Sequence, residues 1–341
     1  MTAAFPRSLP EFVRMFPDDS ACGLYLEQVR WPDGFVCPSC GERGEAIRFA
    51  ASPTRRRCRV CRHDASLTAG TVMHRSHSPL TQWFWAAYLV ATQTYGMSAV
   101  QFQRQIGIKR YETAFQMLHK LRAGMVRPNV DRIGGKDVRI EMDETLVGGE
   151  TRGEGKGVHH KIYVVGAVEV RERPPLAPGK TPTKAMLRRA GKYAGRLRLR
   201  VIESRQHGPL LDFARESIAP GSRVTTDDWG GYDRLAEECG VYHTQIAERG
   251  DPAMAEQHLP LIHLVFSNLK TWVLGTHHSV SDQHMQAYLN EYIFRFNRRF
   301  YPFNGFRSLL GLAMQNESAS YDELYSGHHK HPVAAGEFAL T

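Results

Sequence analysis

Four cysteines stand in two closely spaced pairs, and this spacing constrains the first part of the chain more than any other feature. The pairs are Cys37-Pro-Ser-Cys40 and Cys58-Arg-Val-Cys61, whereas Cys22 and Cys239 are isolated. Paired thiolates of this kind can reach one tetrahedral ion, and the pairing argues against a disulfide framework. A module this small needs the metal for its stability. We therefore expect residues 1–76 to comprise an N-terminal segment and a zinc ribbon with the ligands Cys37, Cys40, Cys58 and Cys61.

The chain is basic. Its 341 residues include 44 Lys and Arg against 35 Asp and Glu, a formal net charge of +9. An excess of this kind favours a polyanionic partner such as DNA. Several arginines surround the second cysteine pair, and among them we expect Arg56 and Arg57 to contact DNA phosphates. A basic face that is merely solvated is the alternative, because such clusters are common.

No apolar run approaches the length that a bilayer crossing requires. The N-terminus carries Glu11, Asp18 and Asp19, where a signal peptide would be apolar. The hydrophobic content of 42% is enough for packed cores. We expect a soluble protein of the bacterial cytoplasm, associated with DNA and not with a membrane.

Residues 77–126 have the pattern of three helices. Ser78 and Pro79 open the first helix, and Gly96 ends it. Ser98 with Gln101 forms a capping box that opens the second, and Gly107 makes a tight turn into the third. This arrangement predicts a helix-turn-helix domain that binds DNA, with a small helical linker domain as the alternative. Two cations at the start of the third helix, Lys109 and Arg110, are candidate phosphate contacts.

Residues 135–315 are expected to form an α/β domain. Alternating patterns predict strands at 138–149, 161–170 and 195–204, and shorter strands at 223–226 and 241–246. Helices are expected after Pro209, at 233–238 and in two further segments from Pro260 to Arg299. This order is that of a ribonuclease-H-like fold, a mixed sheet flanked by helices. Residues 171–194 form a basic surface insertion, helical in part near 183–190, and 316–341 form a C-terminal tail.

Two acidic residues are expected to meet in this domain. Asp143 lies within the first strand, on the same face as Glu141, and a carboxylate there is costly unless a cation or polar partner faces it. Asp227 ends the fourth strand, which lies beside the first in a ribonuclease-H-like sheet. Phosphoryl transfer on DNA uses two divalent cations ~3.5 to 4 Å apart, held by convergent carboxylates. We expect Asp143 and Asp227 to bind Mg²⁺ or Mn²⁺.

The chain resembles the insertion-sequence transposases that join an N-terminal zinc ribbon to a DDE-type domain, the ISXO2-like family. The resemblance covers nearly the whole chain and rests on these blocks: RWPDGFVCPSC, the second cysteine pair, the helix-turn-helix, MDETLVGG, TTDDWGGY, SNLKTWVLGTHH and YLNEYIFRFNRR. It implies that Asp143 is the first catalytic acid and Asp227 the second. Asp228 stands where the family commonly has Gly.

The third acid of the family is commonly a Glu seven residues before a Lys. Counting back from Lys270 gives His263, which implies that His263 is the third catalytic residue and Lys270 a phosphate contact. An imidazole can ligate a divalent metal, although Mg²⁺ prefers oxygen. Asn268 is the second candidate, because its amide oxygen is a hard ligand. The alternative for His263 is an ordinary helix histidine with no special role.

The resemblance implies a transposase that binds the terminal inverted repeats of its element and cleaves and joins DNA strands. It would use structural Zn²⁺ and catalytic Mg²⁺ or Mn²⁺, act on repeat and target DNA, and form a homo-oligomer at synapsis. Two alternatives are a non-catalytic DNA-binding regulator and a ribonuclease-H-like nuclease that joins no strands. The retention of Asp143 and Asp227 speaks against the first, and the DNA-binding N-terminal half speaks against the second.

Overall fold

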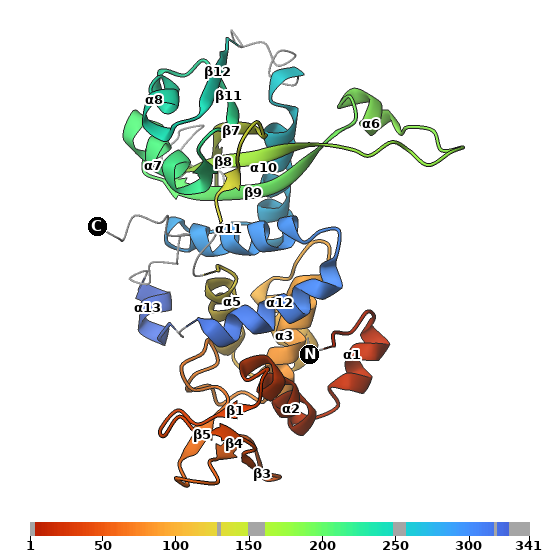
Figure 1. The fold of residues 1–341 in the computed structure, drawn as a ribbon, viewed down its shortest axis with the longest axis vertical. Helices are drawn as coiled ribbons and strands as arrows, with labels where there is room; N and C mark the ends of the chain where they lie inside the picture. Colours follow the sequence, from red (N-terminus) through yellow and green to blue (C-terminus); the bar gives the residue numbers. More distant parts are fainter. Residues whose placement is uncertain (1–3, 128–130, 149–160, 248–256, 317–318, 327–341) are drawn as a thin grey trace. The chain divides into compact units, whose positions relative to one another are not determined.

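A computed structural model describes residues 4–127, 131–148, 161–247, 257–316 and 319–326. The chain divides into two compact units (Figure 1). The first combines Met1–Arg127 with Arg298–His331, and the second is formed mainly by Pro128–Asn297. Among the described residues, no helix has both the length and the apolarity needed to cross a membrane.

The first unit begins with two helices and a set of short strands. Ser8 and Asp18 cap the helices by accepting hydrogen bonds from the backbone of the first turn. The helices are α1 (Leu9–Met15) and α2 (Asp19–Arg30). Strand β1 (Phe35–Val36) pairs with β2 (Arg43–Gly44), and a three-stranded antiparallel sheet joins β3 (Ile47–Phe49), β4 (Ser52–Arg57) and β5 (Asp64–Ser66).

The three helices predicted after the ribbon are present. They are α3 (Leu80–Thr92), α4 (Ala99–Ile106) and α5 (Tyr111–Gly124). The Ser98 hydroxyl accepts the backbone N–H of Gln101, and Gly107 ends α4 with φ +69°, a left-handed conformation that favours glycine. Helix α3 begins two residues after Ser78, without a side-chain cap.

A helix from the C-terminal part of the chain completes this unit. Phe306 of α12 (Pro302–Gln315) is fully buried, and its ring packs on aromatic side chains from the N-terminal helices: Phe12, Phe16, Tyr25, Phe84 and Tyr88. The short α13 (Tyr321–Ser326) follows. We expected the catalytic domain to extend to residue 315. The structure places its end at Asn297, because the apolar face of α12 packs in the first unit.

The second unit is built on a five-stranded mixed sheet with the order β12-β11-β7-β8-β9. Three strands form an antiparallel meander: β7 (Arg139–Val147), β8 (Ile162–Glu172) and β9 (Lys192–Ile202). Strand β11 (Arg223–Asp227) runs parallel to β7, and β12 (Tyr242–Ile246) runs parallel to β11. The predicted ribonuclease-H-like arrangement, with the fourth strand beside the first, is thus confirmed.

Helices cover both faces of this sheet. On one face, α10 (Pro260–Trp272), the π-helical turn η2 (Val273–His277) and α11 (Asp282–Asn297) bury an apolar cluster that includes Val168, Leu197 and Phe266. The opposite face contacts α7 (His207–Ser217), the 3-10 turn η1 (Gly230–Tyr232) and α8 (Leu235–Cys239). Ile140 and Met142 of β7 point to this second face, which alternation in a strand requires if Glu141 and Asp143 point to the first.

The basic insertion is shorter than predicted. Arg171 and Glu172 pair with Tyr193 and Lys192, so both ends of the 171–194 segment belong to the meander. The remainder carries α6 (Lys184–Arg188), in the region where a partial helix was expected. Figure 1 shows β8 and β9 continuing into an arm that extends away from the sheet.

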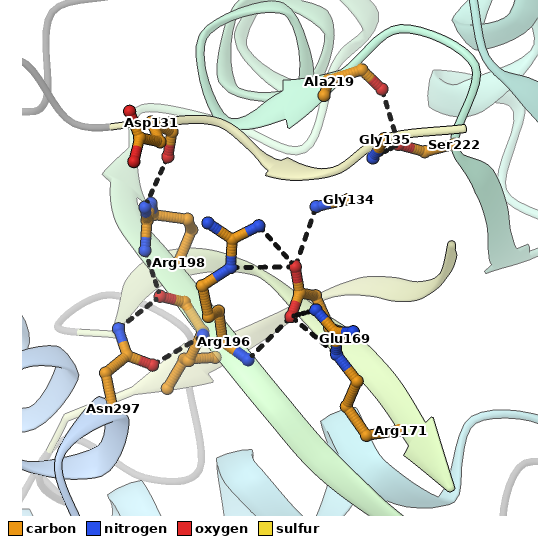
Figure 2. Close-up of polar contacts among 11 residues, drawn as sticks. Asp131, Gly134, Gly135, Glu169, Arg171, Arg196, Arg198, Ala219, Ser222 and Asn297 are labelled. Carbon is orange, nitrogen blue, oxygen red and sulfur yellow. Dashed lines mark hydrogen bonds and ion pairs between the residues drawn. The ribbon is translucent and has the colours of Figure 1, made fainter. Parts of the chain in front are cut away.

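A buried carboxylate ties the start of this unit to its sheet. Glu169 accepts hydrogen bonds from Arg171 at 2.7 Å, from Arg196 at 2.9 Å and from the backbone of Gly134 at 3.0 Å (Figure 2). Gly134 belongs to β6 (Ile133–Gly134), which pairs with β10 (Ile218–Ala219). Although burial raises the pKa of Glu169, these donors outweigh it and lower the pKa to about 2.

Candidate active site and zinc centre

The four paired cysteines lie together. The Sγ atoms of Cys37 and Cys61 are 3.6 Å apart, those of Cys40 and Cys58 are 3.8 Å apart, and all four lie within 4.8 Å of one another. Four sulfur ligands at ~2.3 Å from a tetrahedral zinc ion would lie about 3.8 Å from each other. The donor set and its spacing therefore fit Zn²⁺, as the sequence predicted.

One arginine of the ribbon cannot have the predicted role. Arg56 is 2% exposed, and its guanidinium donates to Glu27 at 2.8 Å and to the carbonyl of Pro53 at 2.9 Å. The expectation that Arg56 contacts DNA is therefore wrong, since its guanidinium is buried in the first unit and its charge is paired with that of Glu27. Arg57 lies nearer the surface, where it forms a bidentate ion pair with Asp64.

The two candidate cations of the third helix are exposed. Lys109 and Arg110 directly precede α5, and neither side chain is buried. They lie where a phosphate could reach them. Their contact with DNA stays a prediction.

The second unit brings three carboxylates together. Asp143 of β7 and Asp227, the last residue of β11, lie in neighbouring strands because Thr225 pairs with Glu141. Carboxylate oxygens of Asp143, Glu144 and Asp227 lie within 4.8 Å of one another. Burial raises the pKa of Asp227, and the charge of Asp143 adds to the effect. Clustered oxygen donors of this kind fit a hard divalent cation. Asp228 is exposed, in agreement with Asp227 as the inward residue.

Sequence reasoning missed Glu144. Alternation places its side chain on the face of β7 opposite to Asp143, so the pattern gave no reason to combine the two. In the structure, the Tyr232 hydroxyl donates to Glu144 Oε2 at 2.5 Å, and the guanidinium of Arg205 lies 3.7 Å from Oε1. Burial raises the pKa of Glu144 to about 7. The one sequence feature that could have indicated Glu144 was its position directly after Asp143.

The helix that carries the third candidate is attached to the strand that carries the first. Glu141 Oε2 accepts the backbone N–H groups of Leu261 at 2.7 Å and Ile262 at 2.9 Å, at the start of α10. His263 follows, with its Nε2 atom 3.1 Å from Asp143 Oδ2. Burial of the Glu141 carboxyl raises its pKa to about 7 in spite of the two donors.

The other two candidates on α10 are exposed. Lys270 lies two turns after His263, and partial burial lowers its pKa, while the charge of Asp143 acts in the opposite direction. Asn268 points to solvent, and among the described residues no hydrogen bond joins it to the acidic cluster. The direct contact with Asp143 therefore favours His263 over Asn268.

A tryptophan and an arginine lie beside the carboxylates. The backbone N–H of Trp229 donates to Asp227 at 3.2 Å, and its indole N–H donates to the carbonyl of Arg205 at 2.7 Å. The Arg205 guanidinium lies 3.7 Å from the centre of the Trp229 ring. These contacts connect the loop after β11 to the residues after β9 at the edge of the cluster.

Comparison with known proteins gives two family matches. Residues 134–297 match the ISXO2-like transposase domain, and residues 17–64 match the transposase zinc-ribbon domain. The chain is also similar to an uncharacterized protein in transposable element ISH50 of Halobacterium salinarum. The two are 24% identical over 295 residues, which cover 83% of this chain and 92% of that protein. No solved structure matches the chain.

Proposed function

Because the chain belongs to the ISXO2-like transposases with a zinc ribbon, we propose that it catalyses the cleavage and strand transfer of its own insertion sequence. The observation that carries this proposal is the meeting of Asp143 and Asp227 on adjacent parallel strands. Chains retained only for DNA binding have no need for half-buried acidic residues that repel each other. The DNA reaction needs them to hold Mg²⁺ or Mn²⁺.

Different residues of the site would have different roles in the proposed reaction. Bound divalent cations would supply Lewis acidity to the attacking and leaving oxygens of a phosphodiester. Asp143 and Asp227 would hold those cations. His263, which contacts Asp143, would be a further ligand of a cation or would orient the attacking water. Lys270, on the same face of α10, contacts a phosphate of the bound strand. The nucleophile is water in the cleavage step and the freed 3′-OH in the joining step.

Recognition of DNA belongs to the first unit. The zinc ribbon and the helix-turn-helix bind the terminal inverted repeats, with Arg57, Lys109 and Arg110 as phosphate contacts. Since a transposition complex must hold two ends, we infer that the chain forms a homo-oligomer at synapsis. A regulator without catalysis, or a nuclease that joins no strands, remains the competing function.

The test uses full-length, zinc-loaded protein, oligonucleotides that carry the ends of the element, and Mg²⁺ or Mn²⁺. We expect cleavage at the 3′ ends and joined products, both absent in Asp143→Asn and Asp227→Asn, which should bind the ends as the parent does. Asp228→Asn is the matched control, because Asp228 is exposed beside the cluster. Binding without cleavage by the parent protein would support a regulator. Cleavage without joining would support a nuclease.

A further inference from the structure

We propose that Glu144 is the third carboxylate ligand of the cation site, beside Asp143 and Asp227. This inference rests on the proposed function, since it concerns the same site. It assigns the third oxygen to β7 itself, whereas the pattern of the family places it on α10. His263 then orients Asp143 instead of replacing the missing acid.

The geometry brings Glu144 to the site from the far side of the strand. Asp143 reaches the cluster from the face covered by α10, and Glu144 starts from the face that carries Tyr232. The longer Glu side chain nevertheless places an oxygen within 4.8 Å of the ligand atoms of Asp143 and Asp227. Neighbouring residues of one strand thus contribute oxygens from both faces to one point.

A second observation is that a buried hydroxyl group holds the Glu144 carboxylate. Tyr232 is fully buried, and its hydroxyl donates to one oxygen of Glu144 at 2.5 Å. Buried metal-binding carboxylates are commonly fixed in this way by a donor behind them. Such a donor orients the carboxylate and leaves its other lone pairs free for a ligand.

The charges around Glu144 do not balance. Its side chain is 7% exposed and lies against two further carboxylates, and the guanidinium of Arg205 is 3.7 Å away. Arg205 and the more distant Lys270 offset at most two of the three negative charges, and burial of an uncompensated carboxylate is costly unless a cation is added. A divalent ion would supply the missing positive charge, and Mg²⁺ prefers these oxygens to an imidazole nitrogen.

The position of His263 agrees with this assignment. Its Nε2 atom lies 3.1 Å from Asp143 Oδ2, a hydrogen-bonding distance. Through this contact the imidazole ring can orient the Asp143 carboxylate, as residues that hydrogen-bond to a metal ligand commonly do. Three oxygens then form the cation site, and the histidine sets the orientation of one of them.

The experiment measures Mn²⁺ binding to full-length, zinc-loaded protein by calorimetry, together with melting temperatures with and without Mn²⁺. In Glu144→Gln, which keeps an acceptor for Tyr232, we expect Mn²⁺ affinity to fall by about tenfold or more. Without Mn²⁺ its melting temperature should equal or exceed that of the parent, because the repulsion among the carboxylates is relieved. The rise in melting temperature on adding Mn²⁺ should be lost. Glu172→Gln, which removes an exposed carboxylate of the same sheet, is the control and should match the parent.

Two results would overturn the assignment. Parental Mn²⁺ affinity in Glu144→Gln would exclude Glu144 as a ligand. A lower metal-free melting temperature combined with a normal Mn²⁺-induced rise would make it a structural partner of Tyr232. Asp143→Asn separates this inference from the proposed function: if it too binds Mn²⁺ normally, the whole site is misplaced, whereas loss in Asp143→Asn alone contradicts only the role of Glu144.

Discussion

Glu141, on β7, accepts the backbone N–H of Ile262, on α10, at 2.9 Å. The same oxygen accepts the N–H of Leu261, so a buried carboxylate satisfies the start of the helix. Asp143 lies two residues further along β7, and His263 follows Ile262. The strand that carries Asp143 therefore also positions the helix that carries His263.

Replacing Glu141 should disturb the position of His263. In Glu141→Ala, two buried N–H groups lose their acceptor, which costs about 1–3 kcal/mol each. We expect a clearly lower melting temperature and a loss of DNA cleavage. Glu141→Gln, which retains an acceptor oxygen, should preserve most of both. If the two variants cleave DNA equally well, the attachment of α10 does not matter for catalysis.

His263 and Asn268 can be separated by substitution on the same helix. His263→Ala should lower the cleavage rate strongly, because Asp143 loses its partner at 3.1 Å. Asn268→Ala changes an exposed residue and should cleave normally. If His263 itself ligates the cation, His263→Glu should retain activity and shift the metal preference from Mn²⁺ towards Mg²⁺, since oxygen replaces nitrogen. If Glu144 is the third ligand, as proposed above, His263→Glu places another carboxylate beside Asp143 and should lower the cleavage rate. The reverse result in the two alanine variants would transfer the role to Asn268.

The zinc centre should be necessary for the ribbon. We expect metal analysis to find one zinc ion per chain and Cys58→Ser to lose both the ion and binding to the DNA ends, because the buried apolar cluster of the ribbon is small. Cys239→Ser is the control, since this buried cysteine belongs to the second unit and lies outside the cluster of thiols. Normal DNA binding by a zinc-free protein would contradict the assignment.

Glu169 should make the second unit sensitive to acid. Its pKa in the folded protein is about 2, below the ordinary value of 4.5. The stability that it contributes is therefore complete above pH 4.5 and is lost as the pH falls from 4.5 towards 2. We expect Glu169→Gln to cost roughly 2 kcal/mol at neutral pH, with Arg171 and Arg196 partly screened by solvent.

The measurement is a series of melting temperatures of Glu169→Gln and the parent between neutral pH and pH 2. The difference between the two proteins should shrink as the pH falls, and zinc loss, which affects both alike, cancels in the comparison. Glu172→Gln should follow the parent, because that carboxylate is exposed. A difference that is independent of pH would mean that the charge of Glu169 is not what stabilises the unit.

The sequence predicted those features that depend on local spacing. Cysteine spacing gave the zinc ligands, and strand alternation with the order of elements gave the sheet in which Asp227 adjoins Asp143. Features set by long-range packing escaped it. Arg56 belongs to a run of basic residues, and this run does not indicate that Arg56 is buried and hydrogen-bonded to Glu27. Glu144 was missed because alternation places it, correctly, on the face opposite Asp143, and the pattern does not show that its longer side chain reaches the acidic cluster from there. The hydrophobic pattern of α12 likewise does not indicate which of the two units its apolar face packs in.

The position of α12 in the chain determines when the first unit can be completed during synthesis. Phe306 packs in the aromatic core of the N-terminal helices, yet the ribosome translates it after the entire five-stranded sheet of the second unit. A nascent chain that has emerged only as far as Asn297 still lacks α12, which packs in its first unit. If this unit recognises the ends of the element, as proposed, a prematurely ended chain is a poor competitor for them. Competence to bind DNA then arises only after α12 has been synthesised.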